Sequence, residues 1–389
     1  MKKFSRFLPT KRSFNLCTLF FFTLCILWIL YLSLTVIHVI SKEYHLFREN
    51  SPQQLLHYFK ASSYKRIQKN ERFRYKGRIL NGSFELVGKY FDIRGEQVKK
   101  LHFPMKDFFR LSKNNIHDFI FVTAANSIYF NALELLITNI QKYFPDKRIL
   151  VFDIGLKRRQ ASYIHEFCNV TLTNFKRDFS FLPRHIYEPT KYTWKPVVIY
   201  EALRSYGATG VWWVDTSVRF QSSNMSKIYN KLQESDGLLG FSGVEQLSFA
   251  LSMNKTYEYL PTRVDRMKDL GQIGTGSLMV YRTYRAVSRV LNWWLLCAFD
   301  ENCMNPSRGE RLCSKAAVEC NRNDQSTLNI LLANSYNFKL SNYQLNTQTF
   351  RYSRSDVEHK VRACRRNSKF KDKLKVASSD LVLWTDYGV

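Results

Sequence analysis

Two aspartates stand directly after short apolar runs that are typical of buried strands. Asp215 follows Val211-Trp-Trp-Val214, and Asp153 follows Arg148-Ile-Leu-Val-Phe152. A carboxylate beyond the end of a strand can hold a divalent cation, and carboxylate plus phosphate oxygens suit Mg²⁺ or Mn²⁺. The same residue type also caps helices and forms turns, so a purely structural role is the alternative. We expect Asp215 to be a metal ligand and Asp153 to border the same binding site.

A glycine-rich segment, Gly271-Gln-Ile-Gly-Thr-Gly-Ser277, precedes the apolar run Leu278-Met-Val-Tyr281. Its glycines would let the backbone pass close to a sugar or a phosphate. It is not a Walker loop, because it lacks the G-K-[ST] ending. A plain glycine-rich turn before a strand is the alternative. The candidate binding residues here are Gly274, Thr275 and Gly276.

Further polar residues open two predicted helices. Lys195 precedes a helix expected over residues 196–206, with a proline in its first turn. Asp324 and Gln325 open a second, apolar helix. Each position also has a plain structural interpretation, as a solvent-facing lysine or as a helix cap.

Alternating strands and helices must position these residues. Strands are expected at residues 119–123, 148–152, 170–173, 211–214 and 278–281, and helices at 132–143, 160–167, 196–206 and 283–298. This alternation predicts an α/β fold with a mostly parallel sheet and helices on both faces. In such sheets ligands bind beyond the carboxyl ends of the strands. There the small side chains of Ala124, Ala125 and Asn126 would let a base or a ribose approach the first strand.

An uncharged run of twenty-one residues, 16–36, follows a basic N-terminus and has no small-residue cleavage site after it. About twenty apolar residues span a bilayer as a helix, and basic flanks stay cytoplasmic. The alternative, a cleaved signal peptide, usually has a shorter apolar stretch. We expect a retained signal anchor with single-pass type II topology, which places the body in the lumen of the Golgi or another secretory compartment.

Cysteines and glycosylation tripeptides fit that location. Six of the eight cysteines lie outside the expected anchor, which allows three disulfides whose pairing the sequence leaves open. No C-x-x-C pair occurs, so we expect local disulfides rather than zinc between Cys297 and Cys320. The N-x-[ST] acceptors begin at Asn81, Asn169, Asn224 and Asn254.

The chain is strongly basic, with a formal net charge of +27, and 45% of its residues are apolar, enough for a sizeable core. Such a charge suggests an anionic partner. A luminal location argues against nucleic acid and leaves a nucleotide diphosphate, an acidic glycan or a lipid headgroup. The alternative is that most Lys and Arg residues only form a solvated face.

The order of the motifs resembles that of the GT-A-fold glycosyltransferases, which use nucleotide sugars. The likeness spans residues 118–336 and is carried by Lys195-Pro-Val-Val-Ile-Tyr-Glu-Ala-Leu, Gly207, Val211-Trp-Trp-Val-Asp215-Thr-Ser217-Val and Asn323-Asp-Gln-Ser-Thr-Leu-Asn329. More narrowly, the chain resembles a family of glycosyltransferase-like type II membrane proteins.

This resemblance implies a UDP-linked sugar donor, Mn²⁺ or Mg²⁺ at Asp215, and a hydroxyl of a glycan or glycoprotein as acceptor. It implies that Lys195 faces the donor, that residues 274–276 line the sugar site, and that Asp324 and Gln325 meet the acceptor as general base or orienting partner. The expected segments are a cytoplasmic tail (1–13), the anchor (14–40), a stem and N-terminal extension (41–115), a GT-A-like catalytic domain (116–345) and a basic C-terminal extension (346–389).

One position departs from the family pattern, because Ser217 stands where a second carboxylate is usual. A hydroxyl adds no negative charge to offset a divalent cation. Two mechanisms stay open: a metal held by Asp215, another group and the diphosphate, or a diphosphate neutralised by Lys195. The departure also keeps open a catalytically inactive luminal binding or structural module. A sulfotransferase is a weaker alternative, since no suitable phosphate loop is present, and the absence of G-x-S-x-G gives no support to a Ser-His-Asp hydrolase.

Overall fold

The structure is a computed structural model of the chain and describes residues 70–78, 85–241, 243–306, 320–353 and 363–366. The expected tail, the anchor and the first part of the stem lie outside the described residues, as does Asn81. Among the residues described, no helix is long and apolar enough to cross a membrane. The anchor at residues 14–40 therefore stays a prediction.

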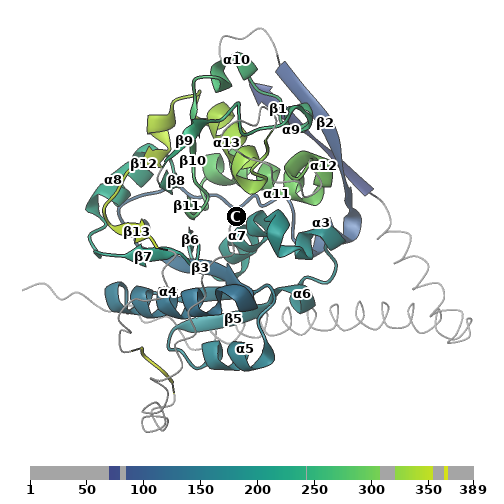
Figure 1. Ribbon diagram of the computed structural model, residues 1–389. Coiled ribbons are helices and arrows are strands. Elements are labelled where there is room, and N and C mark those ends of the chain that lie inside the picture. The colour runs from purple at the N-terminus through teal and green to yellow at the C-terminus, as the bar shows by residue number, and fades with distance from the viewer. Residues whose placement is uncertain (1–69, 79–84, 242, 307–319, 354–362, 367–389) are drawn as a thin grey trace, which may run out of the picture. The chain divides into compact units, whose positions relative to one another are not determined.

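A seven-stranded sheet with the order β12-β8-β11-β6-β3-β4-β5 forms the centre of the body (Figure 1). Strands β3, β4, β5 and β6 pair in parallel, β11 runs antiparallel to β6 and β8, and β12 is parallel to β8. The expectation of a mostly parallel sheet is confirmed. The strands are β3 (Phe119–Ala125), β4 (Ile149–Asp153), β5 (Val170–Asn174), β6 (Gly210–Val214), β8 (Leu238–Phe241), β11 (Ser277–Tyr281) and β12 (Gln344–Leu345).

Helices cover both faces of this sheet, because successive strand residues point to opposite sides. Ile120 and Val122 of β3 belong to one core with residues of α7, α11 and α13, whereas Phe119 and Phe121 belong to the other with residues of α4, α5 and α8. Strand β3 is buried along its whole length, as a central parallel strand must be. The covering helices are α4 (Phe130–Tyr143), α5 (Arg158–His165), α7 (Trp194–Ser205), α8 (Ser226–Glu234), α11 (Asn292–Phe299) and α13 (Asp324–Ser335).

Shorter elements complete the described body. Two strand pairs flank the sheet: β7 (Val218–Phe220) with β13 (Phe350–Tyr352), and β9 (Gly243–Leu247) with β10 (Gly271–Ile273). The short helices are α3 (Gly95–Lys100), α6 (Phe175–Asp178), α9 (Asn254–Tyr259), α10 (Val264–Met267) and α12 (Glu301–Met304). Single 3₁₀ turns lie at Ser127–Tyr129, Arg184–Tyr187, Pro189–Lys191 and Leu340–Asn342.

The predicted strands and helices are present, with two differences. Gly271–Ile273, expected as part of a glycine-rich loop, forms strand β10 and pairs with β9. The helix expected over residues 283–298 begins as a π-helical segment, Arg285–Leu291, before it continues as α11. Only Gly274 to Gly276 therefore form the turn that leads into β11.

A hairpin before the sheet packs onto the body. Strands β1 (Asn70–Arg78) and β2 (Glu85–Arg94) pair antiparallel, and Tyr75, Phe91 and Ile93 lie in the same core as α7, α11 and α13. Arg72, Arg74 and Lys76, which alternate with Phe73 and Tyr75 along β1, are exposed. Part of the segment expected as an N-terminal extension thus contributes to the hydrophobic core.

Two disulfides join described residues. Cys297 and Cys303, six residues apart, are bonded, which confirms a local disulfide in that cluster. Cys168 and Cys364 are bonded across a sequence separation of 196 residues, and Cys320 is also disulfide-bonded. The long-range bond places part of the basic C-terminal extension beside β5.

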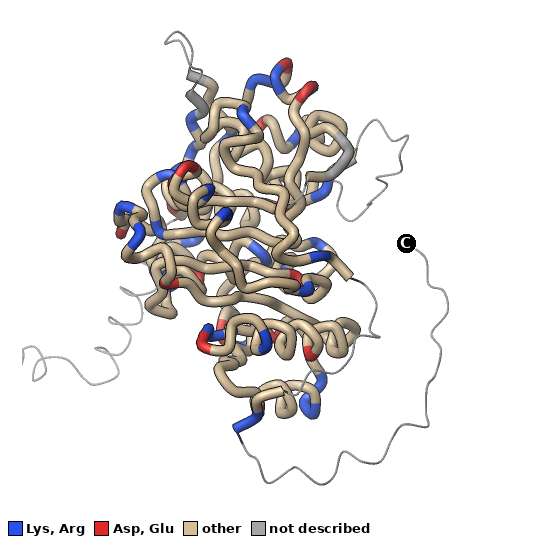
Figure 2. The backbone as a smooth tube through the Cα atoms, turned by 90° about the vertical axis from the view of Figure 1, so that its left-hand side faces the viewer, with Lys and Arg blue, Asp and Glu red and all other residues tan. Residues whose placement is uncertain are grey.

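The remaining basic and polar surface features are dispersed. Figure 2 shows Lys and Arg along the whole described body, with fewer Asp and Glu between them. The acceptor asparagines Asn169, Asn224 and Asn254 are all exposed. Their glycosylation stays a prediction.

Candidate functional site

The sheet reverses its strand order at β3, which creates a site for a ligand. Strands β4 and β5 follow on one side of β3, and β6 lies on the other. Ligands in open α/β sheets bind beyond the carboxyl ends of the strands at such a reversal. The residues found at or just after these ends are Asn126, Asp153, Asn174 and Asp215.

A buried lysine holds two carboxylates together at this edge. The Lys195 Nζ lies 2.9 Å from Oδ2 of Asp324 and 3.5 Å from Oδ1 of Asp215. The side chains of Lys195 and Asp324 are only 2% and 6% exposed, whereas that of Asp215 is 36% exposed. The interpretation of Lys195 as a solvent-facing residue is therefore wrong.

Lys195 has no unused hydrogen for a phosphate. An ammonium has three N–H donors, and Nζ also lies 3.3 Å from both the carbonyl oxygen and the hydroxyl of Thr275. The Thr275 hydroxyl in turn donates to Oδ2 of Asp324 at 2.7 Å. Lys195 could contact a diphosphate only by giving up one of these partners, so the arrangement favours a role in positioning the carboxylates.

The electrostatics of this cluster follow from burial and mutual attraction. Burial disfavours the ammonium of Lys195, but the carboxylates of Asp215 and Asp324 outweigh that effect and raise its pKa above the usual lysine value. Burial raises the pKa of Asp215; Lys195 opposes this shift, and the Asp324 carboxylate adds to it. Solvent reaches about a third of the Asp215 side chain, so we expect Asp215 to be ionised at neutral pH. One ammonium and two carboxylates then carry a formal charge of −1.

The Gly274–Gly276 turn fixes the orientation of Asp215. The backbone N–H of Asp215 donates to the carbonyl oxygen of Gly276 at 2.8 Å. The indole N–H of Trp213 lies 3.0 Å from both Asp215 Oδ1 and the Thr275 carbonyl oxygen. The preceding strand therefore holds Oδ1 through Trp213, and the turn holds the backbone of Asp215.

These residues fit a divalent cation only as part of a larger ligand set. The described residues contain no group of three or more His, Cys, Asp or Glu side chains that could hold a metal. Asp215 offers a carboxylate that is about a third exposed, in a cluster of net negative charge, and Ser217 is half-buried nearby. Phosphate oxygens of a bound ligand would have to complete the coordination.

Asp324 and Gln325 face the interior. They form the first turn of α13, and the amide of Gln325 donates to Oε1 of Gln272 at 2.8 Å. Both residues are buried. The structure thus joins Asp324 to Lys195 and Thr275 rather than presenting it to solvent.

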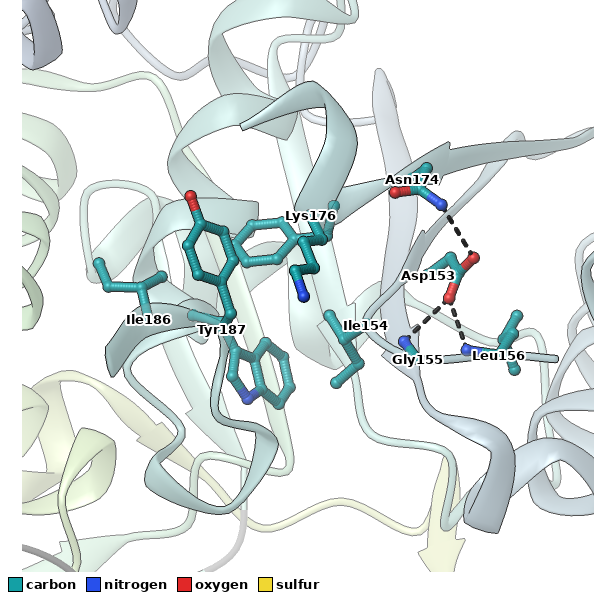
Figure 3. A pocket seen from close by; sticks show the side chains of 10 residues that line it. Asp153, Ile154, Gly155, Leu156, Asn174, Lys176, Ile186 and Tyr187 are labelled. Atoms are coloured by element: carbon teal, nitrogen blue, oxygen red, sulfur yellow. Dashed lines mark hydrogen bonds between the residues drawn. The ribbon is translucent and has the colours of Figure 1, made fainter. Parts of the chain in front are cut away.

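A pocket of about 200 Å³ lies beside the cluster, at the ends of β4 and β5 (Figure 3). Asp153 borders it, and its Oδ1 accepts hydrogen bonds from the backbone N–H groups of Gly155 and Leu156 at 2.9 and 2.6 Å. Trp194 also borders the pocket and packs 5.8 Å from the ring of Trp213. The other lining residues are Ile154, Gly155, Leu156, Asn174, Phe175, Lys176, Ile186 and Tyr187.

The residues at the end of β3 are buried or hydrogen-bonded within the protein. Ala124 and Ala125 are buried in the two opposite cores, and Asn126 uses its Oδ1 to accept the Ile128 N–H at 3.1 Å. A contact between these residues and a base or ribose stays a prediction.

Sequence reasoning missed the aromatic residues of the site. Trp194 and Trp213 adjoin the recognised Lys195 and Asp215, so adjacent indoles beside charged residues were a usable signal. Tyr352, which lies against Gly276, belongs to a stretch that we expected to be a basic extension. No local pattern marks it.

Comparison with known proteins gives a partial family match. A family model described as a protein of unknown function (DUF1647) matches residues 61–200, which include Asp153 and Lys195 but not Asp215 or Asp324. No curated protein matches the chain.

Several solved structures of glycosyltransferases are similar to the chain. The galactosyltransferase LgtC, in complex with donor and acceptor sugar analogues, is 15% identical with a TM-score of 0.35, covering 60% of this chain and 87% of LgtC. GlyE of Streptococcus pneumoniae TIGR4 is 11% identical with a TM-score of 0.33, covering 59% of this chain and 45% of GlyE. The bifunctional glycosyltransferase WbbM is 9% identical with a TM-score of 0.37, covering 59% of this chain and 39% of WbbM. At these values the similarity carries no argument about this chain, so the function must be argued from the site.

Proposed function

We propose that this protein is a glycosyltransferase that moves a sugar from a nucleotide diphosphate donor, UDP-linked, to a hydroxyl of a glycan or glycoprotein. The observation that carries the proposal is the carboxylate of Asp215, which is 36% exposed and is held by Lys195 and Trp213 at the reversal of strand order. A carboxylate in that place suits a cation-bound diphosphate.

The pocket beside Trp194 would take the nucleoside. Its volume of about 200 Å³ is below the roughly 300–1,000 Å³ of typical ligand pockets, so it suits a base with part of a ribose rather than a whole nucleotide sugar. Phe175, Tyr187 and Trp194 supply apolar surface, and Lys176 supplies a positive charge. The diphosphate would then extend from Trp194 toward Asp215.

Asp215, with Ser217 nearby, would hold Mn²⁺ or Mg²⁺ together with oxygens of the diphosphate. Such an ion, when bound, offsets the negative charge of a departing diphosphate. Lys195 acts indirectly, because its ammonium holds Asp215 and Asp324 in a fixed relation. The net charge of −1 in this cluster argues against a diphosphate bound there without a cation.

A catalytically inactive binding module is the second candidate. The burial of Asp324 and Gln325 favours it, since neither side chain is open to an acceptor hydroxyl. For either function we propose a luminal location in the Golgi or another secretory compartment, through the anchor expected at residues 14–40.

The decisive experiment measures nucleotide-sugar turnover by the full-length chain with Mn²⁺, with Mg²⁺ and in chelator. We expect Asp215→Asn to lower turnover by about 100-fold or more, the usual scale for losing a group that stabilises developing charge. Asp265→Asn is the matched control, because Asp265 is 58% exposed on α10 and pairs with the exposed Arg263. Equal turnover of wild type and Asp215→Asn would contradict the proposal.

Ser217→Asp tests the cation separately. An added carboxylate should tighten Mn²⁺ binding, which can be followed by paramagnetic resonance without any turnover. Binding of UDP that is equally strong in chelator, and unchanged by either substitution, would remove the metal from the mechanism. Strong binding of UDP without turnover of any nucleotide sugar would favour the inactive module.

A further inference from the structure

A C-terminal strand brings a tyrosine to the exposed side of Asp215. Strand β13 pairs antiparallel with β7, which places Tyr352 opposite Val218. The N–H of Ser353 donates to the carbonyl oxygen of Ser217 at 2.7 Å. Because β7 begins three residues after Asp215, this ladder fixes Tyr352 beside the carboxylate.

Phe350 anchors that strand. It is 5% exposed in the core that includes Trp212 and Phe220, and its ring meets the Tyr352 ring edge to face at 5.7 Å. Alternate residues of a strand lie on the same face. Tyr352 therefore extends the aromatic face of the core outward to the sheet edge, where it is 41% exposed.

Gly276 leaves the space in which the tyrosine ring lies. A Cβ at position 276 would stand 2.8 Å from Cε1 of Tyr352, 3.3 Å from its hydroxyl and 3.3 Å from Oδ2 of Asp215. The same point is thus close to both the tyrosine and Oδ2 of Asp215. Because no positive φ requires a glycine at this position, the lack of a side chain is what matters.

We infer that Tyr352, with Gly276 and Asp215, forms a platform for a pyranose ring. An exposed aromatic ring offers an apolar surface for the C–H face of a sugar, and its hydroxyl gives a polar edge. The negative face of an aromatic ring does not attract a phosphate. The platform lies next to Asp215 on the side of β7 and β13, whereas the nucleoside pocket lies at β4 and β5.

The ring that binds there can come from the donor or from the acceptor, and this inference rests on the proposed function. If the ring belongs to the donor, the full-length chain should bind UDP-galactose, UDP-glucose or UDP-N-acetylglucosamine more tightly than it binds UDP. If the ring belongs to the acceptor, the platform should raise the rate of sugar transfer to methyl glycosides relative to the rate at which the same donor is hydrolysed. We call the quotient of these two rates the transfer ratio.

The test compares Tyr352→Ala, Tyr352→Phe and Gly276→Ala with the wild type. We expect Tyr352→Ala to lower either the UDP-sugar preference or the transfer ratio by about 3- to 10-fold, the scale of an aromatic contact. Tyr352→Phe should keep most of the effect, because the ring remains. Gly276→Ala should resemble Tyr352→Ala, since its methyl group displaces the ring.

A double variant separates this contact from damage to the fold. In Gly276→Ala/Tyr352→Ala no ring is left to clash, so any loss beyond that of Tyr352→Ala alone would measure the crowding of Asp215 Oδ2 by the new methyl group. Tyr284→Ala, at an exposed tyrosine that packs on Phe108, should leave both ratios unchanged. If Tyr352→Ala changes neither ratio by more than about twofold, there is no platform.

The two proposals fail in different ways. If the wild type turns over no nucleotide sugar, the proposed function fails, and the binding comparison of UDP-sugar with UDP still reports on the platform. If turnover is present but insensitive to Tyr352, only the platform fails.

Discussion

The ammonium of Lys195 lies 2.9 Å from a carboxylate oxygen of Asp324, and both side chains are almost completely buried. Removing one member of such a pair leaves an uncompensated charge in the interior. The pair also links α7 to the first residue of α13, so its loss would disturb the position of Asp215 as well.

We predict that Lys195→Met lowers the free energy of unfolding by about 3–5 kcal/mol, the scale for breaking a buried ion pair. Lys191→Met is the matched control. Lys191 also contacts two carboxylates, but Glu188 and Glu301 are 49% and 38% exposed. That variant should lose less than about 1 kcal/mol. Urea denaturation of both variants measures the difference, and equal losses would contradict the role given to burial.

Stability should fall above about pH 10. Burial raises the pKa of Tyr75 from 10.0 to about 12, although Asn334 and Arg289 oppose the shift. Between these two values the folded state binds more protons than the unfolded state, so each pH unit should cost about 1.4 kcal/mol for this group. Below pH 10 the contribution is fully present. The pKa of Lys195 is also raised, so its contribution to stability should likewise be lost as the pH rises.

Tyr75→Phe should reduce this alkaline slope, because it removes the titrating phenol while keeping the ring. The measurement is the free energy of unfolding between pH 9 and pH 11 for both proteins. A slope that is the same in the two proteins would show that Tyr75 titrates alike in the folded and unfolded states.

The Cys168–Cys364 disulfide should stabilise the protein strongly. It closes a loop with a sequence separation of 196 residues, for which the chain-entropy model gives about 5 kcal/mol. We expect Cys168→Ala/Cys364→Ala to lower the free energy of unfolding by up to this amount. Denaturation without reductant tests it, and a change below about 1 kcal/mol would mean that the contacts of Arg365 and Arg366 with Glu166 already hold the segment.

The exposed acceptor asparagines should carry glycans if the body is luminal. Expression in a secretory host followed by glycosidase digestion should give a mobility shift, and Asn→Gln changes at Asn169, Asn224 and Asn254 should reduce it. No shift, together with protease digestion of the body outside intact microsomes, would show that the expected orientation is wrong.

The sequence alone predicted the α/β elements and the position of Asp215. Those features depend on local properties: the apolar run of β6, the helical spacing in α4 and the proline in the first turn of α7. A residue that directly follows a buried strand must lie at the ligand-binding edge of a parallel sheet. This part of the site is therefore readable without a structure.

Only the tertiary structure decided which side chains meet. Lys195 could equally have faced solvent or a phosphate, and its partnership with Asp324 and Thr275 depends on how α7, α13 and the turn before β11 pack. Cys168 and Cys364, like Gly276 and Tyr352, are brought together from distant parts of the chain. A local pattern records which residues are apolar or polar, but contacts of 3 to 4 Å arise from strand order and register, which many segments determine together.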